Sequence, residues 1–245
     1  SDVCSSDLDF ETYSEAGYEW DEVANRWKRL PGASKYGLSA CGSAVYAEHP
    51  STEVLCLAYD LKDGLGARLW LQGQKPPMDL FHHVVSGGLI EAHNAGFEYR
   101  IWKNVCSAKM GWPPIKLEQL RDSIEKCRAR ALPGALAKVT AILDTDVKKD
   151  TEGARLIKKF CCPRQPTKND PRRRILPTDD PADFANLGRY CVTDIKSESS
   201  VSIRVPDLSP EELDFAIATR HMNHRGVGVD IPSVKACIAI LEQAY

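Results

Sequence analysis

Two acidic residues near the start of the chain, Asp9 and Glu11, are spaced so that both can bind one divalent metal ion. Alternate side chains of an extended segment share a face, so we expect both carboxylates to point the same way, with Phe10 on the opposite side. Carboxylates this close repel each other unless a cation lies between them, and hard ions such as magnesium or manganese prefer oxygen ligands. Acidic pairs also occur on ordinary solvated surfaces, so this pair gains meaning only if further acids converge on it.

Two later motifs supply acids that can converge on this pair. In Asn94-Ala-Gly-Phe-Glu98 the first and last residues are four apart, on one face of a helix that we expect to follow a buried strand at 89–92. In Tyr190-Cys-Val-Thr-Asp194 the same spacing places a phenol and a carboxylate side by side on a long helix. Each motif is weak evidence alone. The three in this order predict a metal site built from several parts of the chain.

The order of the motifs resembles that of the DEDD superfamily of 3′–5′ exonucleases, in the branch with tyrosine in the third motif. The surrounding sequence is similar to the proofreading domain of phage-type family A DNA polymerases, relatives of DNA polymerase I. The resemblance covers about residues 9–207 and rests on Asp9-Phe-Glu-Thr12, His49-Pro-Ser-Thr-Glu-Val54, Ala92-His-Asn-Ala-Gly-Phe-Glu98, Leu132-Pro-Gly-Ala-Leu136, Lys149-Asp150, Gly153 and Leu156-Ile157.

This resemblance implies a fold and a reaction. The fold would be α/β of the ribonuclease H-like kind, with a mixed five-stranded sheet, three of its strands antiparallel, and helices on both faces. The reaction would be metal-dependent 3′–5′ hydrolysis of DNA, releasing nucleoside monophosphates as proofreading within a replicative polymerase. The implied cofactors are two divalent ions, Mg²⁺ or Mn²⁺. The implied partners are the 3′ end of single-stranded DNA at a primer terminus and a covalently linked polymerase domain.

The resemblance also implies roles for the acids of the motifs. Asp9, Glu11 and Asp194 would hold one metal ion, with Asp9 shared to the second. Glu98 would serve the second ion, where the family usually has aspartate, so both direct and water-mediated contact are open. Tyr190 and Glu11 would orient the attacking water, because an unperturbed phenol with a pKa of about 10 orients water better than it removes a proton.

Residues beside the acids are candidates for holding DNA. The resemblance implies that the backbone near Thr12, with Asn94 and Phe97, positions the terminal nucleotide. Phe97 can stack on a base, although a phenylalanine on an apolar helix face more often belongs to the core. His93 can contact phosphate or support the start of its helix.

Charge is distributed unevenly along the chain despite a formal net charge of −2. Residues 1–26 hold eight acids and one arginine, whereas residues 147–174 hold ten basic and three acidic residues. The basic segment, which includes Lys148 and Lys149, either follows a phosphate backbone or forms a solvated loop.

Composition limits the class of protein. The 245 residues are 43% hydrophobic and 27% charged, as in ordinary globular proteins. There is no apolar run of the roughly 18 to 20 residues that a membrane helix needs, and no secretory signal at the start, so we expect no membrane contact. Nine cysteines without a regular framework favour free thiols in a reducing compartment, which we expect to be cytoplasm, host cytoplasm for a phage protein. Cys161 and Cys162 lack the spacing of a zinc site.

We expect three regions. Residues 1–8 resemble the translation of a sequencing adapter and are expected to replace native strand residues. Residues 9–207 would be the exonuclease domain. Residues 208–245 would be the truncated helical start of a polymerase domain, since the segment at 225–230 resembles the passage between the two domains.

Periodicity and turn signals predict the elements that position these motifs. We expect strands at the opening motif and at 37–46, 53–59, 67–71 and 89–92. We expect helices at 78–86, from 94 onward, at 117–130, 133–144, 152–160, 184–203, from 210 to about 225 and from 231 to the end, with a loop at 161–182.

Two other functions remain open. An RNA-trimming member of the same superfamily would differ in its relative rates on matched DNA and RNA. A catalytically silent module that guides DNA to a polymerase would be recognised by the failure of its four acids to converge.

Overall fold

The computed structural model describes residues 5–145 and 151–244. The chain forms two compact units, Ser1–Ser209 and Pro210–Tyr245, and each is described by itself.

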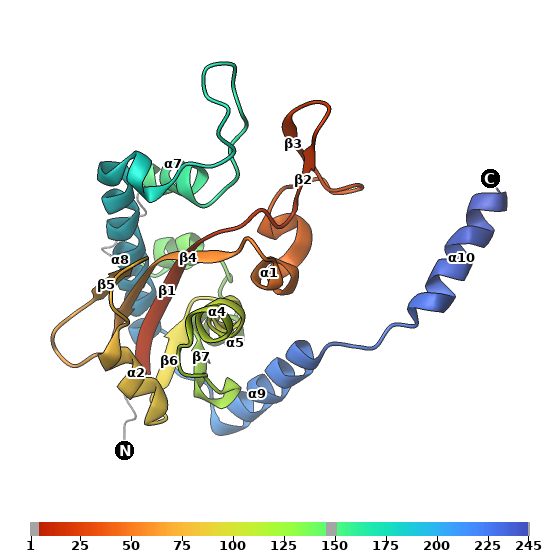
Figure 1. Cartoon of the computed structure of the whole chain (residues 1–245). Helices are drawn as coiled ribbons and strands as arrows, with labels where there is room; N and C mark the ends of the chain where they lie inside the picture. Colours follow the sequence, from red (N-terminus) through yellow and green to blue (C-terminus); the bar gives the residue numbers. More distant parts are fainter. Residues whose placement is uncertain (1–4, 146–150, 245) are drawn as a thin grey trace. The chain divides into compact units, whose positions relative to one another are not determined.

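The larger unit is built on a mixed five-stranded sheet (Figure 1). Its strands, in spatial order, are β5 (Arg68–Leu71), β4 (Glu53–Asp60), β1 (Ser5–Tyr13), β6 (Leu89–Ala92) and β7 (Leu120–Asp122). β4 pairs antiparallel with both β1 and β5, whereas β6 and β7 continue the sheet in parallel beyond β1. The fold is therefore α/β with a mixed sheet of the ribonuclease H-like kind, as predicted.

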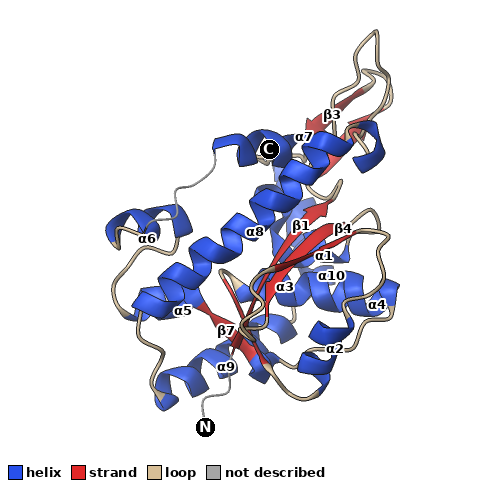
Figure 2. Ribbon diagram, turned by 90° about the vertical axis from the view of Figure 1, so that its left-hand side faces the viewer, coloured by secondary structure: helices blue, strands red, loops and turns tan. Residues whose placement is uncertain are grey.

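Helices cover both faces of this sheet (Figure 2). They are α1 (Leu38–Glu48), α2 (Met78–Val85), α3 (Ala95–Ile101) continued by a π-helical turn (Trp102–Ser107), α4 (Ala108–Met110), α5 (Ser123–Ala129), α6 (Leu136–Ile142), α7 (Thr151–Phe160) and α8 (Pro181–Arg204). Short 3₁₀ turns occur at Leu117–Gln119 and Pro177–Asp179. Figure 2 shows α8 on one face and α2, α3 and α4 on the other.

The central strand separates apolar from acidic side chains by simple alternation. Leu8 and Phe10 enter the main core, where the Phe10 ring lies 6.2 Å from that of Trp102. Asp9 and Glu11 lie on the opposite face, which α8 covers. The prediction that these two carboxylates share a face and that Phe10 lies opposite is confirmed.

The long helix α8 begins with strong start signals and packs closely on the sheet. The Asp180 carboxylate accepts a hydrogen bond from the Asp183 backbone, and Pro181 occupies the first turn. A Cβ on Gly188 would lie 2.7 Å from the Leu69 side chain of β5, so the missing side chain lets the helix approach the sheet. This approach brings the third motif over β1.

The predicted strand at 37–46 is wrong, since α1 occupies this region. Gly37, with φ 60°, redirects the chain, and a second glycine at 42 kinks the helix. Small residues fill most of the segment, and Tyr46 and Ala47 are buried against the main core. The local composition is compatible with a strand, but the packing of Tyr46 and Ala47 against the core favours the helix.

The predicted helix at 117–130 is also partly wrong, because its first half contains β7. Leu120 is buried and pairs with Ile90, so tertiary pairing with β6 decides the conformation. Only the second half forms α5. The sheet therefore has five strands as expected, with β7 in place of the segment at 37–46.

Other elements agree with the sequence. The strands at 53–59, 67–71 and 89–92 and the helices at 78–86, 152–160 and 184–203 are confirmed within a few residues. A two-stranded hairpin, β2 (Tyr18–Asp21) with β3 (Arg26–Arg29), was not expected.

Residues Ser5–Leu8 form the first half of β1. Ser5, Ser6 and Asp7 pair with β6, and Ser6 and Asp7 are fully buried. The interpretation of this segment as an adapter stays a prediction.

The smaller unit contains α9 (Pro210–Arg225) and α10 (Ile231–Ala244), the two helices expected there. Within the described ranges, no helix is long and apolar enough to cross a membrane.

Candidate active site

Three acids from two elements meet beneath α8. One carboxylate oxygen each from Asp9, Glu11 and Asp194 lies within 4.8 Å of the others. β1 supplies the first two, and α8 supplies the third. Such a set of hard oxygen donors could bind a divalent metal ion.

The cluster is electrostatically unfavourable without a cation. Burial and then the negative charge of Asp194 raise the pKa of Asp9 to about 7. Burial and then Asp9 raise the pKa of Glu11 well above its ordinary value. A bound cation would offset both effects by favouring the charged forms.

Glu98 faces the same acids from α3. Its side chain is only 6% exposed, and its Oε2 atom has no hydrogen-bond partner among the residues that the structure describes. Burial raises its pKa well above the ordinary value, with the Asp9 charge as the next cause. Glu98 lies outside the tight group of three. A buried carboxylate oxygen without a hydrogen-bond partner is energetically unfavourable. A metal ion, or a water molecule bound to it, would supply the Oε2 atom of Glu98 with a partner.

Tyr190 lies one helical turn before Asp194, as the spacing predicted. Its hydroxyl is hydrogen-bonded to the Asp194 carboxylate. Burial and then the Asp194 charge raise the pKa of Tyr190, so the phenol keeps its proton and can donate it in a hydrogen bond. The ring packs against the backbone of α7, where a Cβ on Gly153 would lie 2.1 Å from it.

Two buried thiols touch the acids, a contact that no sequence pattern predicted. Cys161 Sγ lies 3.5 Å from Glu11 Oε2, and Cys191 Sγ lies 3.4 Å from Asp9 Oδ2. Burial raises the pKa of both thiols, so they are neutral donors to the carboxylates. The possible metal ligands that group together within residues 5–145 and 151–244 are carboxylates, and the group includes neither Cys161 nor Cys162.

The backbone at the start of the second motif is hydrogen-bonded to Asp122, a residue that follows the motif by more than twenty positions. Its carboxylate accepts hydrogen bonds from the backbones of Asn94 (3.1 Å) and Ala95 (2.9 Å), and it also caps α5 through Ile124. The expected shared face of Asn94 and Glu98 is wrong, because Asn94 precedes the helix with φ 82° and its side chain is exposed.

Thr12 and Phe97 lie on the Glu11 side of the cluster. The Thr12 hydroxyl is 3.1 Å from that of Tyr46, next to a bulge where the register between β1 and β4 shifts. The half-buried Phe97 ring packs 5.8 Å from the Tyr46 ring. Phe97 is thus part of the core edge and still accessible.

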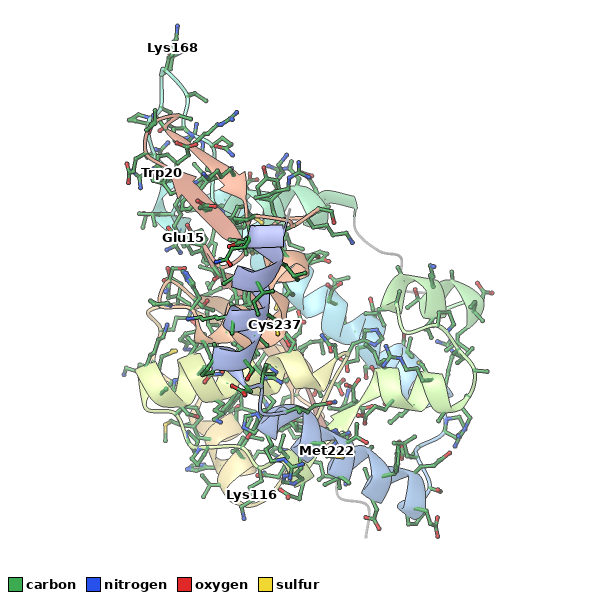
Figure 3. All side chains as sticks on the ribbon, turned by 90° about the vertical axis from the view of Figure 1, so that its right-hand side faces the viewer. Glu15, Trp20, Lys116, Lys168, Met222 and Cys237 are labelled. Atoms are coloured by element: carbon green, nitrogen blue, oxygen red, sulfur yellow. The ribbon has the colours of Figure 1, made fainter. Side chains whose placement is uncertain are left out.

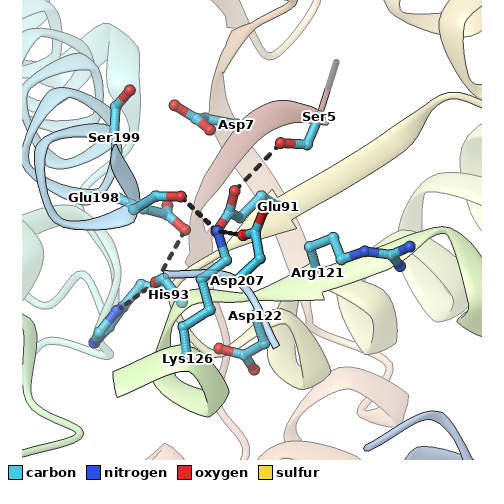
Figure 4. A network of polar contacts seen from close by, with 12 residues as sticks. Ser5, Asp7, Glu91, His93, Arg121, Asp122, Lys126, Glu198, Ser199 and Asp207 are labelled. Atoms are coloured by element: carbon cyan, nitrogen blue, oxygen red, sulfur yellow. Dashed lines mark hydrogen bonds and ion pairs between the residues drawn. The ribbon is translucent and has the colours of Figure 1, made fainter. Parts of the chain in front are cut away.

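His93 has a structural position. Its Nδ1 atom lies 2.8 Å from the Ser123 hydroxyl and its Nε2 atom 2.9 Å from the Gly134 carbonyl, so both ring nitrogens have partners. Ser123 also donates to Glu198 (3.3 Å), a buried acid four residues after Asp194 (Figure 4). The helical spacing could have identified Glu198 as facing the site.

Two cavities adjoin the acids. One of about 220 Å³ is lined by Asp9, Asp194 and Glu198 together with α6 residues. The other, about 260 Å³, is lined by Glu11, Thr12 and Phe97 among others. Both sides of the acidic cluster are therefore open to a substrate.

The basic segment is mostly paired with acids of the protein itself. Lys148 and Lys149 lie outside the described residues. Lys159 forms ion pairs with Asp180 (2.5 Å) and Asp183 (2.6 Å). The ion pairs of the arginines in this segment include Arg155–Glu152, Arg155–Asp183, Arg164–Asp170, Arg172–Asp170, Arg172–Asp179 and Arg174–Glu53.

Two lysines of the segment remain open to solvent. Lys158 and Lys168 are exposed, and Lys168 marks the tip of the loop after α7 (Figure 3). Neither is in an ion pair within the described part of the chain.

Comparison with known proteins identifies a relative. No protein-family profile matches the chain. The chain is 32% identical over 215 residues to a DNA polymerase of Bacillus phage SP02. The match covers 86% of this chain and 32% of the phage protein, so the chain spans about a third of its relative's length. The chain is thus related to a phage DNA polymerase.

Proposed function

We propose that this chain is the 3′–5′ exonuclease domain of a phage-type family A DNA polymerase and hydrolyses DNA from its 3′ end. The observation that carries the proposal is the convergence of Asp9, Glu11 and Asp194, with Glu98 facing them from a third element. The relationship to a phage DNA polymerase supports DNA as the substrate.

The acids fit a pair of divalent ions. Bound there, Mg²⁺ or Mn²⁺ would supply a nucleophilic water near neutral pH and stabilise the leaving 3′-oxygen. Asp9, Glu11 and Asp194 would hold one ion, and Glu98, whose Oε2 atom lacks a partner within the described ranges, would serve the second with Asp9.

The chain's other groups would orient the reactants. Tyr190 keeps its proton and is anchored to Asp194, so it can hold an attacking water by hydrogen bonding without acting as a base. Glu11 would accept a hydrogen bond from the same water. Thr12 and Phe97, which line the cavity beside Glu11, would hold the terminal nucleotide, and Asn94 would contact the strand from the exposed start of α3.

In the full-length protein the domain would be covalently linked to a polymerase domain and act on a primer terminus. The interpretation as a silent guiding module is disfavoured because the acids converge. An RNA-trimming activity would appear as faster hydrolysis of RNA than of matched DNA.

A digestion experiment tests the proposal. Single-stranded DNA carrying a 3′ label should lose it as a nucleoside monophosphate in Mg²⁺ before a 5′-labelled copy shortens appreciably, and EDTA should stop the reaction. Asp194→Ala should abolish release while retaining binding of the strand, whereas Asp214→Ala, at an exposed position on α9, should keep the wild-type rate. Equal release by the wild type and Asp194→Ala would refute the assignment.

A further inference from the structure

Residues 17–37, here called the aromatic arm, leave and rejoin the domain at one point. The Gly37 backbone donates a hydrogen bond to the Gly17 carbonyl (3.2 Å). A Cβ on Gly17 would lie 2.2 Å from the Gly37 carbonyl oxygen, and both glycines have positive φ. Only glycine allows this neck. The arm is thus a self-contained excursion that starts six residues after Glu11.

The arm is braced by the loop at 161–176, beside which it lies in Figure 1. Trp20 and Trp27 face each other across the hairpin with ring centroids 5.1 Å apart, and the Arg173 guanidinium lies 3.7 Å from the Trp20 ring centroid. The Gln165 side chain bonds both the N–H (2.9 Å) and the carbonyl (2.7 Å) of Trp27. These contacts hold the hairpin in one position, so binding to it would cost little ordering.

The base of the arm presents two stacked tyrosines. The Tyr18 ring meets Trp27 edge-on at 6.1 Å, and its hydroxyl is hydrogen-bonded to Cys162. Tyr36 stacks on Tyr18 with centroids 5.2 Å apart and an interplanar angle of 26°. Tyr36 is 43% exposed, so part of this aromatic surface remains open.

The cavity of about 260 Å³ lies between this pair and the acids. Glu11, Thr12 and Phe97 line it together with both tyrosines. Its volume lies just below the range of small-ligand pockets, roughly 300–1,000 Å³, so it suits one nucleotide more than a longer strand. Asp9 and Asp194 line the other cavity.

We propose that the aromatic arm forms the stacking wall for the base of the 3′-terminal nucleotide, with Tyr36 over Tyr18 as its surface. This inference rests on the proposed function and deepens it. Every base has a π face, so such a wall binds all four without reading their edges. A sugar without a base would lose the interaction, and the arm therefore makes excision depend on the presence of a terminal base.

Single-turnover excision from single-stranded DNA tests this role. An abasic residue at the 3′ terminus should slow excision by the wild type between about 5-fold and 150-fold, the equivalent of about 1–3 kcal/mol. Tyr36→Ala should slow excision of a normal nucleotide and abolish the difference between the two substrates, and Tyr36→Trp should restore it. Phe215→Ala removes an exposed ring on α9 and should change neither rate.

A binding measurement makes the test independent of hydrolysis. The fluorescence of a 3′-terminal 2-aminopurine, measured in EDTA, should be quenched by the wild type and much less by Tyr36→Ala. Equal excision of abasic and normal termini by the wild type, an abasic effect confined to the second or third nucleotide, or equal quenching by both proteins would overturn the inference. Loss of the proposed function alone would leave the quenching difference intact.

Discussion

Four carboxylates that repel one another lie at the centre of this protein: Glu11, Glu98 and Glu198 are buried, and Asp9 is half-buried. For each of them, burial is the largest cause that raises the pKa above its ordinary value. Such a group binds its proton more tightly in the folded than in the unfolded chain. Its contribution to stability is therefore fully present below the unfolded pKa and is lost as the pH rises through the folded pKa.

The direction of these pKa shifts predicts how the stability of the metal-free protein depends on pH. With EDTA present, Tm should fall as the pH rises from about 4 to about 7, the window between the ordinary aspartate pKa and the raised pKa of Asp9. Mg²⁺ should restore Tm at the upper end. Asp9→Asn should flatten the decline in a thermal-melt series, and Asp214→Asn should not. A Tm that rises over this window would contradict the electrostatic description of the site.

Period-two spacing predicted the shared face of Asp9 and Glu11, and i,i+4 spacing predicted the contact between Tyr190 and Asp194. The sequence could not predict the Cys161 contact with Glu11, since 150 residues separate them and only the packing of α7 brings them together. It misplaced Asn94 because the hydrogen bonds that the Asn94 and Ala95 backbones donate to the distant Asp122 determine where α3 begins.

At the scale of elements, α7 packs against the Tyr190 ring at Gly153, where the absence of a side chain leaves room for the ring. Gly153→Ala would normally stabilise a helix by about 1 kcal/mol. Here the added Cβ would clash with the buried Tyr190 ring, and overpacking costs about 1–3 kcal/mol. We expect Gly153→Ala to lower Tm and excision rate together. Gly96→Ala, where nothing lies within 4 Å, should not lower Tm. Unchanged Tm and rate in Gly153→Ala would show that the ring is not held in this way.

The first half of β1 carries an unfavourable group. Asp7 is 1% exposed, burial raises its pKa, and its cation partner Lys62 lies nearer the surface. Asp7→Val should therefore raise Tm in a thermal melt, because an apolar residue suits this position in a central strand. Lys62→Ala should lower Tm by leaving the buried carboxylate unpaired. A lower Tm in Asp7→Val would argue that the acid is a native feature of the strand.

Elements with strong local signals were predicted and those fixed by distant partners were not. β4 is apolar and β-rich, and α8 is long, so both were found, although the Asp180 cap and Pro181 at the start of α8 fell within the expected loop. β7 spans three residues and exists through its pairing with β6, which no local pattern reveals.

At the scale of the whole molecule, the internal ion pairs of the basic segment leave few charges for DNA. Lys158→Glu and Lys168→Glu should each weaken binding of single-stranded DNA and reduce its salt dependence, by a slope of roughly 0.7 for each phosphate that the variant no longer neutralises. Lys235→Glu, on α10, serves as the control for net charge. Filter binding across a salt series measures the slopes, and slopes equal to that of the wild type would mean that this surface does not follow the phosphates.

The most direct test of the proposed two-metal site is the number of Mn²⁺ ions bound by the wild type and by Glu98→Gln, measured by electron paramagnetic resonance with single-turnover excision in the same samples. We predict two ions per chain in the wild type and one in Glu98→Gln, with a rate loss of about a hundredfold or more, because the leaving oxygen loses its counter-charge. Glu98→Asp should lose less, through an intervening water. Wild-type stoichiometry and rate in Glu98→Gln at every metal concentration would contradict the assignment of Glu98 to the second ion.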